Sequence, residues 1–157
     1  LGDALKPAVA ILGNAEHKRR IPTGRLIDGL RQRGYTVLVN EAARVGVGRG
    51  KLQVVGLDDP HSGHSRPTAA YASTDPTLWT LTLVHSPEGI LGLEGRRADL
   101  VLSGHTHGGQ IVLPGLGPVA ARKYPVVAGL GPSVAASYSR RIWSSSCRHM
   151  ESTGLFW

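Results

Sequence analysis

The sequence predicts an α/β fold, and three observations lead to this prediction. The apolar residues are mainly Val, Leu, Ile and Ala, with a single Phe among 157 residues, a composition that suits strands buried in a sheet. Several short apolar runs end in turns rich in glycine or polar residues, which is typical of buried strands. Between these runs, residues 22–34 carry apolar side chains at helical spacing. A chain of this length forms one domain with a core of its own.

Two helices are predicted. Residues 22–34 form an amphipathic surface helix, with Thr23 as the expected N-cap and Gly34 as the stop. Residues 87–93 begin with a proline, which suits the first turn of a short helix, and Ser86 is placed to cap it. The expected strands cover residues 8–12, 35–39, 51–57, 77–84, 98–102 and 110–113.

The remaining stretches are interpreted as connections. Residues 40–50 contain a glycine-rich turn, and we expect them to add an edge strand. The polar loop 58–64 holds two carboxylates and two histidines, which admits a metal site of its own. Asp58 and Asp59 are adjacent and tend to point apart, so ordinary turn chemistry is the preferred interpretation. No internal repeat or linker divides the chain.

The chain carries an excess of positive charge, with a net charge of +7. Ten Lys and Arg residues but only four acidic residues lie within residues 1–51. Such a surface attracts partners that bear phosphate, whether nucleic acid, anionic lipid or small molecules, and a merely solvated basic surface is the alternative. Charge alone does not choose among them.

Cysteine content and apolar run lengths bound the cellular setting. Cys147 is the only cysteine, which excludes an internal disulfide and a cysteine-cluster zinc site. No run approaches the roughly 18 apolar residues of a membrane span, and no signal peptide opens the chain. We expect a cytoplasmic protein whose natural start has been lost before Leu1, with membrane association left open because an anchor would be lost with that start.

Polar side chains follow three of the expected strands at the point where each strand ends. Asn14 follows the first strand, His85 follows residues 77–84, and His105 and His107 follow residues 98–102. Each position alone has an ordinary explanation as turn chemistry or a solvated loop histidine. If the strands are parallel neighbours, however, their carboxyl ends share one edge and these side chains converge. Jointly they indicate a metal site.

Three blocks of the sequence resemble the motifs of calcineurin-like metallophosphoesterases, in the bacterial branch of that family. Residues 9–16 resemble the G-N-H-[DE] block, residues 83–87 the block with a lone histidine, and residues 104–110 the G-H-T-H-G-G-Q block. The resemblance implies a four-layer αββα sandwich, a two-metal centre, and hydrolysis of a phosphomonoester or phosphodiester by metal-activated hydroxide. It implies Mn, Fe or Zn as the metal. Carried over residue by residue, the second metal takes Asn14, His85 and His105, and the first takes His107.

The sequence departs from the family pattern at two places. Ala15 stands where the family has a histidine that protonates the leaving group, and His17 would replace it only with a rearranged loop, so no catalytic residue is assigned. The D-x-H and G-D blocks, which supply ligands of the first metal and the bridging carboxylate, have no counterpart here. We therefore expect residues 1–124 to be the C-terminal part of the domain, with N-terminal strands missing. We expect residues 125–157 to be a divergent or irregular tail.

These departures limit the expected activity. All retained ligands are neutral, and two cations without a bridging carboxylate repel each other, so we expect one bound metal or none. We expect weak or no hydrolysis by this chain alone, and an exposed sheet edge or apolar face that lowers stability. The alternatives are a gene fragment without a function of its own, a non-catalytic degenerate family member, and a basic module that binds phosphate or, less favoured, nucleic acid. The substrate and oligomeric state are not predicted.

Overall fold

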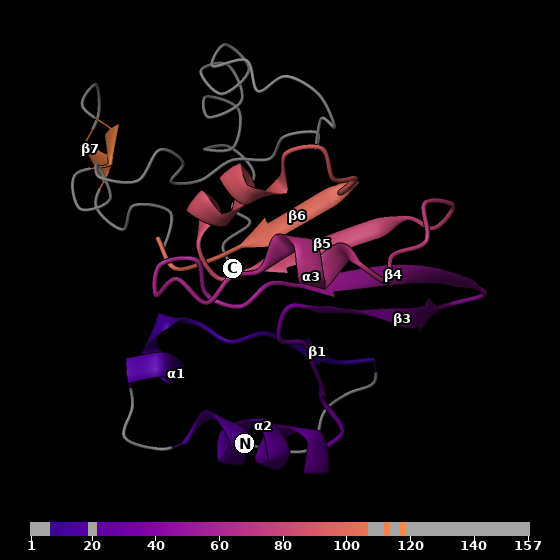
Figure 1. The fold of residues 1–157 in the computed structure, drawn as a ribbon, viewed down its shortest axis with the longest axis horizontal. Helices are drawn as coiled ribbons and strands as arrows, with labels where there is room; N and C mark the ends of the chain where they lie inside the picture. The colour runs from indigo at the N-terminus through magenta and orange to yellow at the C-terminus, as the bar shows by residue number, and fades with distance from the viewer. Residues whose placement is uncertain (1–6, 19–21, 107–111, 114–116, 119–157) are drawn as a thin grey trace.

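The computed structural model describes residues 7–18, 22–106, 112–113 and 117–118, and these residues form a mixed α/β structure (Figure 1). The main sheet has the strand order β3-β4-β5-β6. Its first two strands form an antiparallel hairpin, and β4, β5 and β6 run parallel. The prediction of an α/β fold is confirmed. The four strands are β3 (Glu41–Val47), β4 (Gly50–Gly56), β5 (Thr80–Val84) and β6 (Leu100–Ser103).

A smaller sheet lies against one face of the main sheet. It is a parallel pair of β1 (Val9–Ala10) and β2 (Thr36–Val37), connected through α1 (Asn14–Lys18) and α2 (Thr23–Gln32). The contact between the sheets requires glycine in β4, because a Cβ at Gly56 would lie 2.3 Å from Leu38 Cβ and 3.0 Å from Ile11 Cγ2. In Figure 1 the β1 segment lies between α2 and the main sheet.

The hydrophobic core lies on the other face of the main sheet. Two short helices cover this face, α3 (Pro67–Tyr71) and the 3-10 helix η1 (Pro87–Leu93). The core consists of side chains from β4, β5, these helices and their connections, namely Val55, Leu57, Ala70, Val84, Leu93 and Ala98. Burial of this apolar surface holds the strands whose ends carry the polar side chains of interest.

The predicted helices form, but neither Thr23 nor Ser86 makes a capping hydrogen bond. The first helix begins at Thr23 with Pro22 as its N-cap, and no side chain caps it. Gly34 stops this helix as predicted, with a left-handed φ of 85°. Ser86 precedes η1 but makes no capping hydrogen bond. In both cases the sequence placed a suitable residue correctly to within one position, and the local backbone did not use its hydroxyl.

Several strands are shorter than predicted, and other elements were not predicted. The expected edge strand is present as β3. Helix α3 was missed, although Pro67 at its first turn is a start signal. The last expected strand is reduced to β7 (Val112–Leu113), which pairs antiparallel with β8 (Gly117–Pro118), a stretch that we had not predicted as a strand. Residues 125–157 lie outside the described residues, and the four-layer sandwich stays a prediction.

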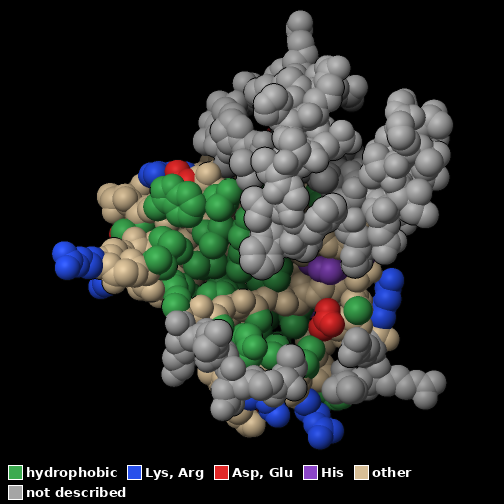
Figure 2. Space-filling model, turned by 180° about the vertical axis from the view of Figure 1, so that it is seen from behind, with side chains coloured by type: hydrophobic (Ala, Val, Ile, Leu, Met, Phe, Trp, Pro, Cys, Tyr) green, Lys and Arg blue, Asp and Glu red, His purple; other side chains and the backbone are tan. Residues whose placement is uncertain are grey.

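Some large apolar side chains remain partly exposed. Figure 2 shows hydrophobic side chains gathered on one face, with Lys and Arg side chains around its periphery. The exposed large hydrophobic residues are Val47, Trp79, Leu91 and Leu102, each between 45% and 53% exposed. Within the described part of the chain, no helix is both long and apolar enough to cross a membrane.

Candidate metal centre

The candidate site lies where three parallel strands end at the same edge of the main sheet. β4 leads into Asp58, β5 into His85, and β6 into His105. The ladder extends slightly past the strand ends, because Leu57 N–H donates to Leu83 O over 2.9 Å and Gly104 N–H donates to His85 O over 3.1 Å. Ligands of open α/β sheets bind at such an edge. The sheet therefore delivers two of the predicted side chains, His85 and His105, to adjacent positions.

Asn14 reaches the same place from the other sheet. It begins α1, just after β1, and its Oδ1 lies 3.3 Å from Nε2 of His85. This approach depends on Gly13, because a Cβ at that position would lie 2.8 Å from both Cε1 and Nδ1 of the His85 ring. The sequence predicted convergence on the condition that the strands are parallel neighbours. That holds for β5 and β6, but β1 belongs to the small sheet, and face-to-face packing of the two sheets brings Asn14 to the site.

His105 completes the described group. Its ring centroid lies 4.7 Å from that of His85, with the rings tilted by 55°. Burial lowers the pKa of His105 below its usual 6.5, and the neighbouring imidazoles of His85 and His61 lower it further. A neutral imidazole is the form that binds a metal. The backbone at His105 is left-handed, with a φ of 68°, which is uncommon for a residue other than glycine and frequent at functional sites.

The structure thus brings together Asn14, His85 and His105, three of the four residues predicted as metal ligands. The fourth, His107, lies outside the described residues. Among the described residues, no three or more His, Cys, Asp and Glu side chains are arranged to hold a metal ion. The group is a partial ligand set of one amide oxygen and two imidazoles, and its role in metal binding stays a prediction.

The loop after β4 lies against these histidines, which the sequence did not reveal. Asp59 is fully buried, and its Oδ2 accepts hydrogen bonds from the backbone N–H and the hydroxyl of Ser62, the turn chemistry that we predicted. Among the residues that the structure describes, none makes a hydrogen bond to its Oδ1. The His61 ring lies beside that of His105, tilted by 39° and with centroids 5.9 Å apart, and its Nδ1 lies 3.4 Å from Glu88 Oε1. The sequence analysis kept a separate metal site in this loop as the less favoured alternative, but it did not predict the contact of His61 with His105.

Asp59 is held in its ionised form. Burial raises the pKa of this carboxyl group, but the hydrogen bonds from Ser62 and His61 and the charge of His85 outweigh burial and lower the pKa below its usual 3.8. Charge-assisted hydrogen bonds of this kind favour the carboxylate.

His17 occupies a different position from the one that would replace the missing proton donor at Ala15. Its Nε2 lies 2.7 Å from Asp58 Oδ1, and its ring stacks on His64 with centroids 4.0 Å apart and planes within 3° of parallel. Asn14 and His17 are three residues apart on α1, so both face the end of the main sheet. The His17 and Asp58 pair anchors α1 to the tip of β4.

Comparisons with known proteins find relatives of one kind. The chain is 35% identical over 114 residues to the uncharacterized metallophosphoesterase YkoQ of Bacillus subtilis, covering 70% of this chain and 42% of that protein. It is 33% identical over 129 residues to phosphodiesterase YaeI of Escherichia coli, covering 79% and 46%. It is 35% identical over 95 residues to UDP-2,3-diacylglucosamine pyrophosphatase LpxG of Chlamydia trachomatis, covering 60% and 28%.

The matches cover the chain better than they cover the relatives, and the chain spans less than half the length of these three proteins. No family model matches the chain. No solved structure matches it significantly.

Proposed function

Because the chain belongs to the calcineurin-like metallophosphoesterase family, we propose that it holds a divalent cation at Asn14, His85 and His105 and takes part in phosphate-ester hydrolysis. Two relatives, YkoQ and YkuE, bear the name metallophosphoesterase, which supports the use of a metal. The observation that carries the proposal is the convergence of these three side chains from three separate segments, with 3.3 Å between Asn14 Oδ1 and His85 Nε2.

The donor atoms fit a borderline transition metal. An amide oxygen and two imidazole nitrogens suit zinc, manganese or iron better than a hard ion such as calcium. The lowered pKa of His105 favours the neutral ring, which is the form that binds a cation. Gly13 leaves space for His85 to lie beside Asn14. We propose His107 as the ligand of a further metal, as the motif implies.

The proposed ligands would bind the ion and orient the phosphate, but the proton donor for the leaving group is missing at Ala15. When bound, the ion stabilises negative charge on phosphate oxygens and makes an attacking water more acidic. Ala15 has no proton to give to a leaving group, and His17 is bonded to Asp58 instead. We therefore propose substrates whose leaving group departs without protonation, such as aryl esters or pyrophosphates. Two relatives bear the names of a phosphodiesterase and a pyrophosphatase, which supports a phosphate-ester substrate.

Metal binding is the direct test. We expect the purified chain to bind Mn²⁺, measured by the loss of the free Mn²⁺ signal in electron paramagnetic resonance, and His105→Ala to weaken this binding at least about tenfold. His64→Ala is the matched control. It also removes a histidine at the same end of the sheet, but the His64 ring stacks on His17 and is not a proposed ligand. Equal Mn²⁺ affinity in wild type and His105→Ala would refute the assignment. Hydrolysis of an aryl phosphodiester in Mn²⁺ gives the second readout.

We also propose that residues 1–124 are the C-terminal part of a four-layer αββα domain and that residues 125–157 form a divergent tail. The order of α2, the small sheet, the main sheet, and α3 with η1 supports the four layers (Figure 1). The missing D-x-H and G-D blocks support an incomplete site. Translation of the genomic sequence upstream of this chain tests the proposal, since these blocks are expected there in frame. An in-frame upstream region without them would refute it.

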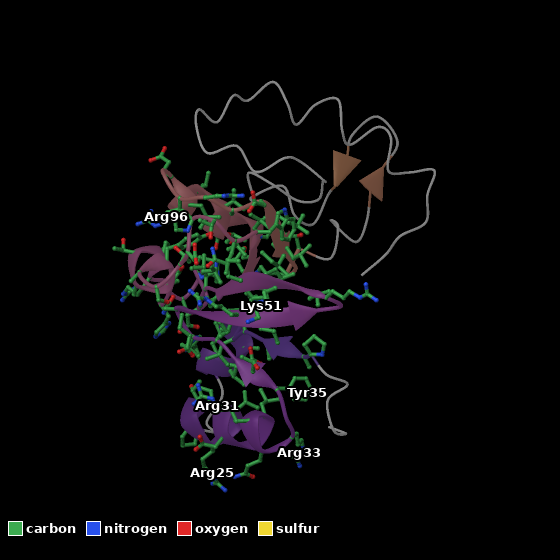
Figure 3. All side chains as sticks on the ribbon, turned by 90° about the vertical axis from the view of Figure 1, so that its right-hand side faces the viewer. Arg25, Arg31, Arg33, Tyr35, Lys51 and Arg96 are labelled. Carbon is green, nitrogen blue, oxygen red and sulfur yellow. The ribbon has the colours of Figure 1, made fainter. Side chains whose placement is uncertain are left out.

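A second candidate function is binding of phosphate-bearing polymers through the basic surface. Figure 3 shows Arg25 and Arg31 on α2 and Arg33 just after it, far from Arg96. No residue of α2 is buried, and Arg31 is only loosely paired with Glu41 over 3.6 Å. Binding to DNA that weakens with salt and survives removal of metal would favour this function over hydrolysis.

A further inference from the structure

We propose that His17 is a positioning residue for the cation site: it fixes helix α1 to Asp58 and thereby holds Asn14 in place to bind the cation. The inference rests on the proposed function, because it concerns the same cation. His17 is not a ligand in this proposal, and it acts on the affinity for the cation only through Asn14.

Helix α1 gains little stability from its own residues. It has five residues, none of which is buried, and an isolated helix of this length is not stable in water. The Gly13 N–H just before the helix donates to Glu16 Oε2 over 2.9 Å, as in one half of a capping box. The Asn14 side chain is left for its contact with His85, which is long for a hydrogen bond at 3.3 Å. The position of Asn14 therefore depends on contacts that other residues of α1 make.

The hydrogen bond of His17 supplies such a contact. Its Nε2 lies 2.7 Å from Asp58 Oδ1, and the two side chains are only 12% and 6% exposed. Shielding from water strengthens a hydrogen bond of this kind. Among the described residues, this bond and that of Asn14 with His85 are the side-chain hydrogen bonds that tie α1 to the strand ends of the main sheet. The shorter of the two is thus made by a residue that is not a proposed ligand.

Asp58 is a rigid partner for His17. Its Oδ1 also accepts the Asp59 N–H over 2.8 Å, which fixes the direction of the carboxylate. Its own N–H donates to Asn40 Oδ1 over 3.1 Å, and the same Asn40 oxygen accepts the Arg66 N–H over 2.7 Å. The start of the loop after β4 is therefore bonded to the residue that precedes β3. A helix tied to such a loop has a defined position.

The spacing along α1 couples the two contacts. Asn14 and His17 are three residues apart, so their side chains lie on the same side of the helix. A rotation of α1 that breaks the bond of His17 with Asp58 also moves the Asn14 amide. The His64 ring stacks on His17, but its Nδ1 lies 3.1 Å from Ser62 Oγ. We therefore assign the positioning to the hydrogen bond rather than to the stack.

The test measures Mn²⁺ affinity by electron paramagnetic resonance in wild type, His17→Ala, Asn14→Ala and the double variant. We expect Asn14→Ala to weaken binding at least about tenfold, and His17→Ala about three- to tenfold, because loss of a positioning residue costs no more than loss of the ligand that it positions. In the Asn14→Ala background, His17→Ala should add less than about twofold, since no amide is left to position. Urea unfolding without metal records the stability of each variant.

His17→Gln is the matched rescue variant. The Gln amide nitrogen can donate to Asp58 in place of Nε2, so we expect Mn²⁺ affinity close to that of wild type. His64→Ala removes the stack but leaves the hydrogen bond, and it should also bind Mn²⁺ as wild type does. If His17→Ala does not fold, His17→Phe replaces it, because Phe keeps a ring against His64 but has no nitrogen for Asp58. The same loss of affinity is then expected.

The outcomes separate this inference from the proposed function. If Asn14→Ala weakens Mn²⁺ binding but His17→Ala, or His17→Phe in its place, binds as well as wild type, the role of His17 is overturned and the proposed function stands. Lower stability with unchanged Mn²⁺ affinity would be this result, a merely structural role. An effect of His17→Ala that is equally large in the Asn14→Ala background would also overturn the inference. Wild type that does not bind Mn²⁺, or Asn14→Ala that binds it equally well, would overturn both.

Discussion

The two ends of the parallel strands β4, β5 and β6 both collect buried polar side chains, but they differ in how these side chains are bonded. At the amino-terminal end, Gln53 is 3% exposed and uses its whole amide group. Its Nε2 donates to Asp75 O and to Thr80 Oγ1, and its Oε1 accepts from Asp75 N–H. Thr80 N–H donates to Asp99 Oδ2 over 2.7 Å. Every group in this network has a partner.

The carboxyl-terminal end holds the unpaired groups. Asp59 Oδ1 and Ser86 Oγ are the buried side-chain atoms without partners within the described residues. The contact between His85 and Asn14 is long, at 3.3 Å. Complete hydrogen bonding stabilises a fold, whereas converging donor atoms that lack partners are what a ligand site requires. The comparison therefore assigns structure to one end and binding to the other.

The largest expected effect is at the amino-terminal end. Gln53→Ala removes three hydrogen bonds and leaves the partly buried backbone of Asp75 and the buried Thr80 hydroxyl without a strong partner, which we expect to cost about 2–4 kcal/mol of unfolding free energy. Urea unfolding measures this loss. Mn²⁺ affinity of the folded variant should be unchanged. A loss of metal binding without a loss of stability would reverse the assignment of the two ends.

Gly13→Ala tests the carboxyl-terminal end. The added methyl group would lie 2.8 Å from the His85 ring, so the ring must move away from Asn14. We expect a stability loss of about 1–2 kcal/mol and a loss of Mn²⁺ affinity of at least about tenfold. Gly24→Ala in α2 is the matched control, because nothing lies within 4 Å of its Cβ. That variant should gain up to about 1 kcal/mol and bind Mn²⁺ normally.

The pH dependence of the unfolding free energy in acid tests a smaller contribution of the amino-terminal end to stability. Burial raises the pKa of Asp99, but the hydrogen bonds from Thr80 and Arg97 outweigh it and lower the pKa below the usual 3.8. The folded state therefore binds its proton at lower pH than the unfolded state. The resulting stability, below about 1 kcal/mol, is complete above pH 3.8 and is lost as pH falls through the lowered pKa.

Asp99→Asn should reduce the change of unfolding free energy with pH in this range, since Asn accepts the hydrogen bond from Thr80 N–H but does not titrate. The measurement is urea unfolding of the metal-free protein between about pH 2 and pH 6, the range in which carboxylates titrate. An equal slope in wild type and variant would show that other carboxylates carry the acid sensitivity.

The sequence predicted where the carboxyl-terminal ends of the strands lie better than it predicted which elements pack around them. Apolar runs that end in Gly13, His85 and Gly104 located the ends of the strands. This was possible because hydrophobic periodicity and turn-forming residues are local properties of the sequence. The residue pattern did not assign β1 and β2 to a separate sheet, since strands of two residues carry almost no pattern, and two packed sheets were expected only from the family resemblance.

Asp59 shows why the remainder of the site was missed. Two adjacent carboxylates in a turn have the local pattern of a solvated loop, and half of that interpretation is correct, because Ser62 does bond to Asp59 as in an ordinary turn. Its complete burial results from long-range packing of η1 and the strand ends around it. Such packing leaves no signal within the loop itself.

The smallest expected effect concerns backbone strain at the carboxyl-terminal end of the parallel strands, the end that the comparison assigns to binding. His105 and Asn40 are the two residues other than glycine with positive φ among those described, at 68° and 55°. Asn40 is bonded through Oδ1 to the N–H groups of Asp58 and Arg66 and through Nδ2 to His64 O, so Asn40→Gly should lower stability. His105→Gly relieves strain and should raise the stability of the metal-free protein by about 0.5 kcal/mol while abolishing its share of Mn²⁺ binding. A destabilised His105→Gly would mean that the ring holds the fold together.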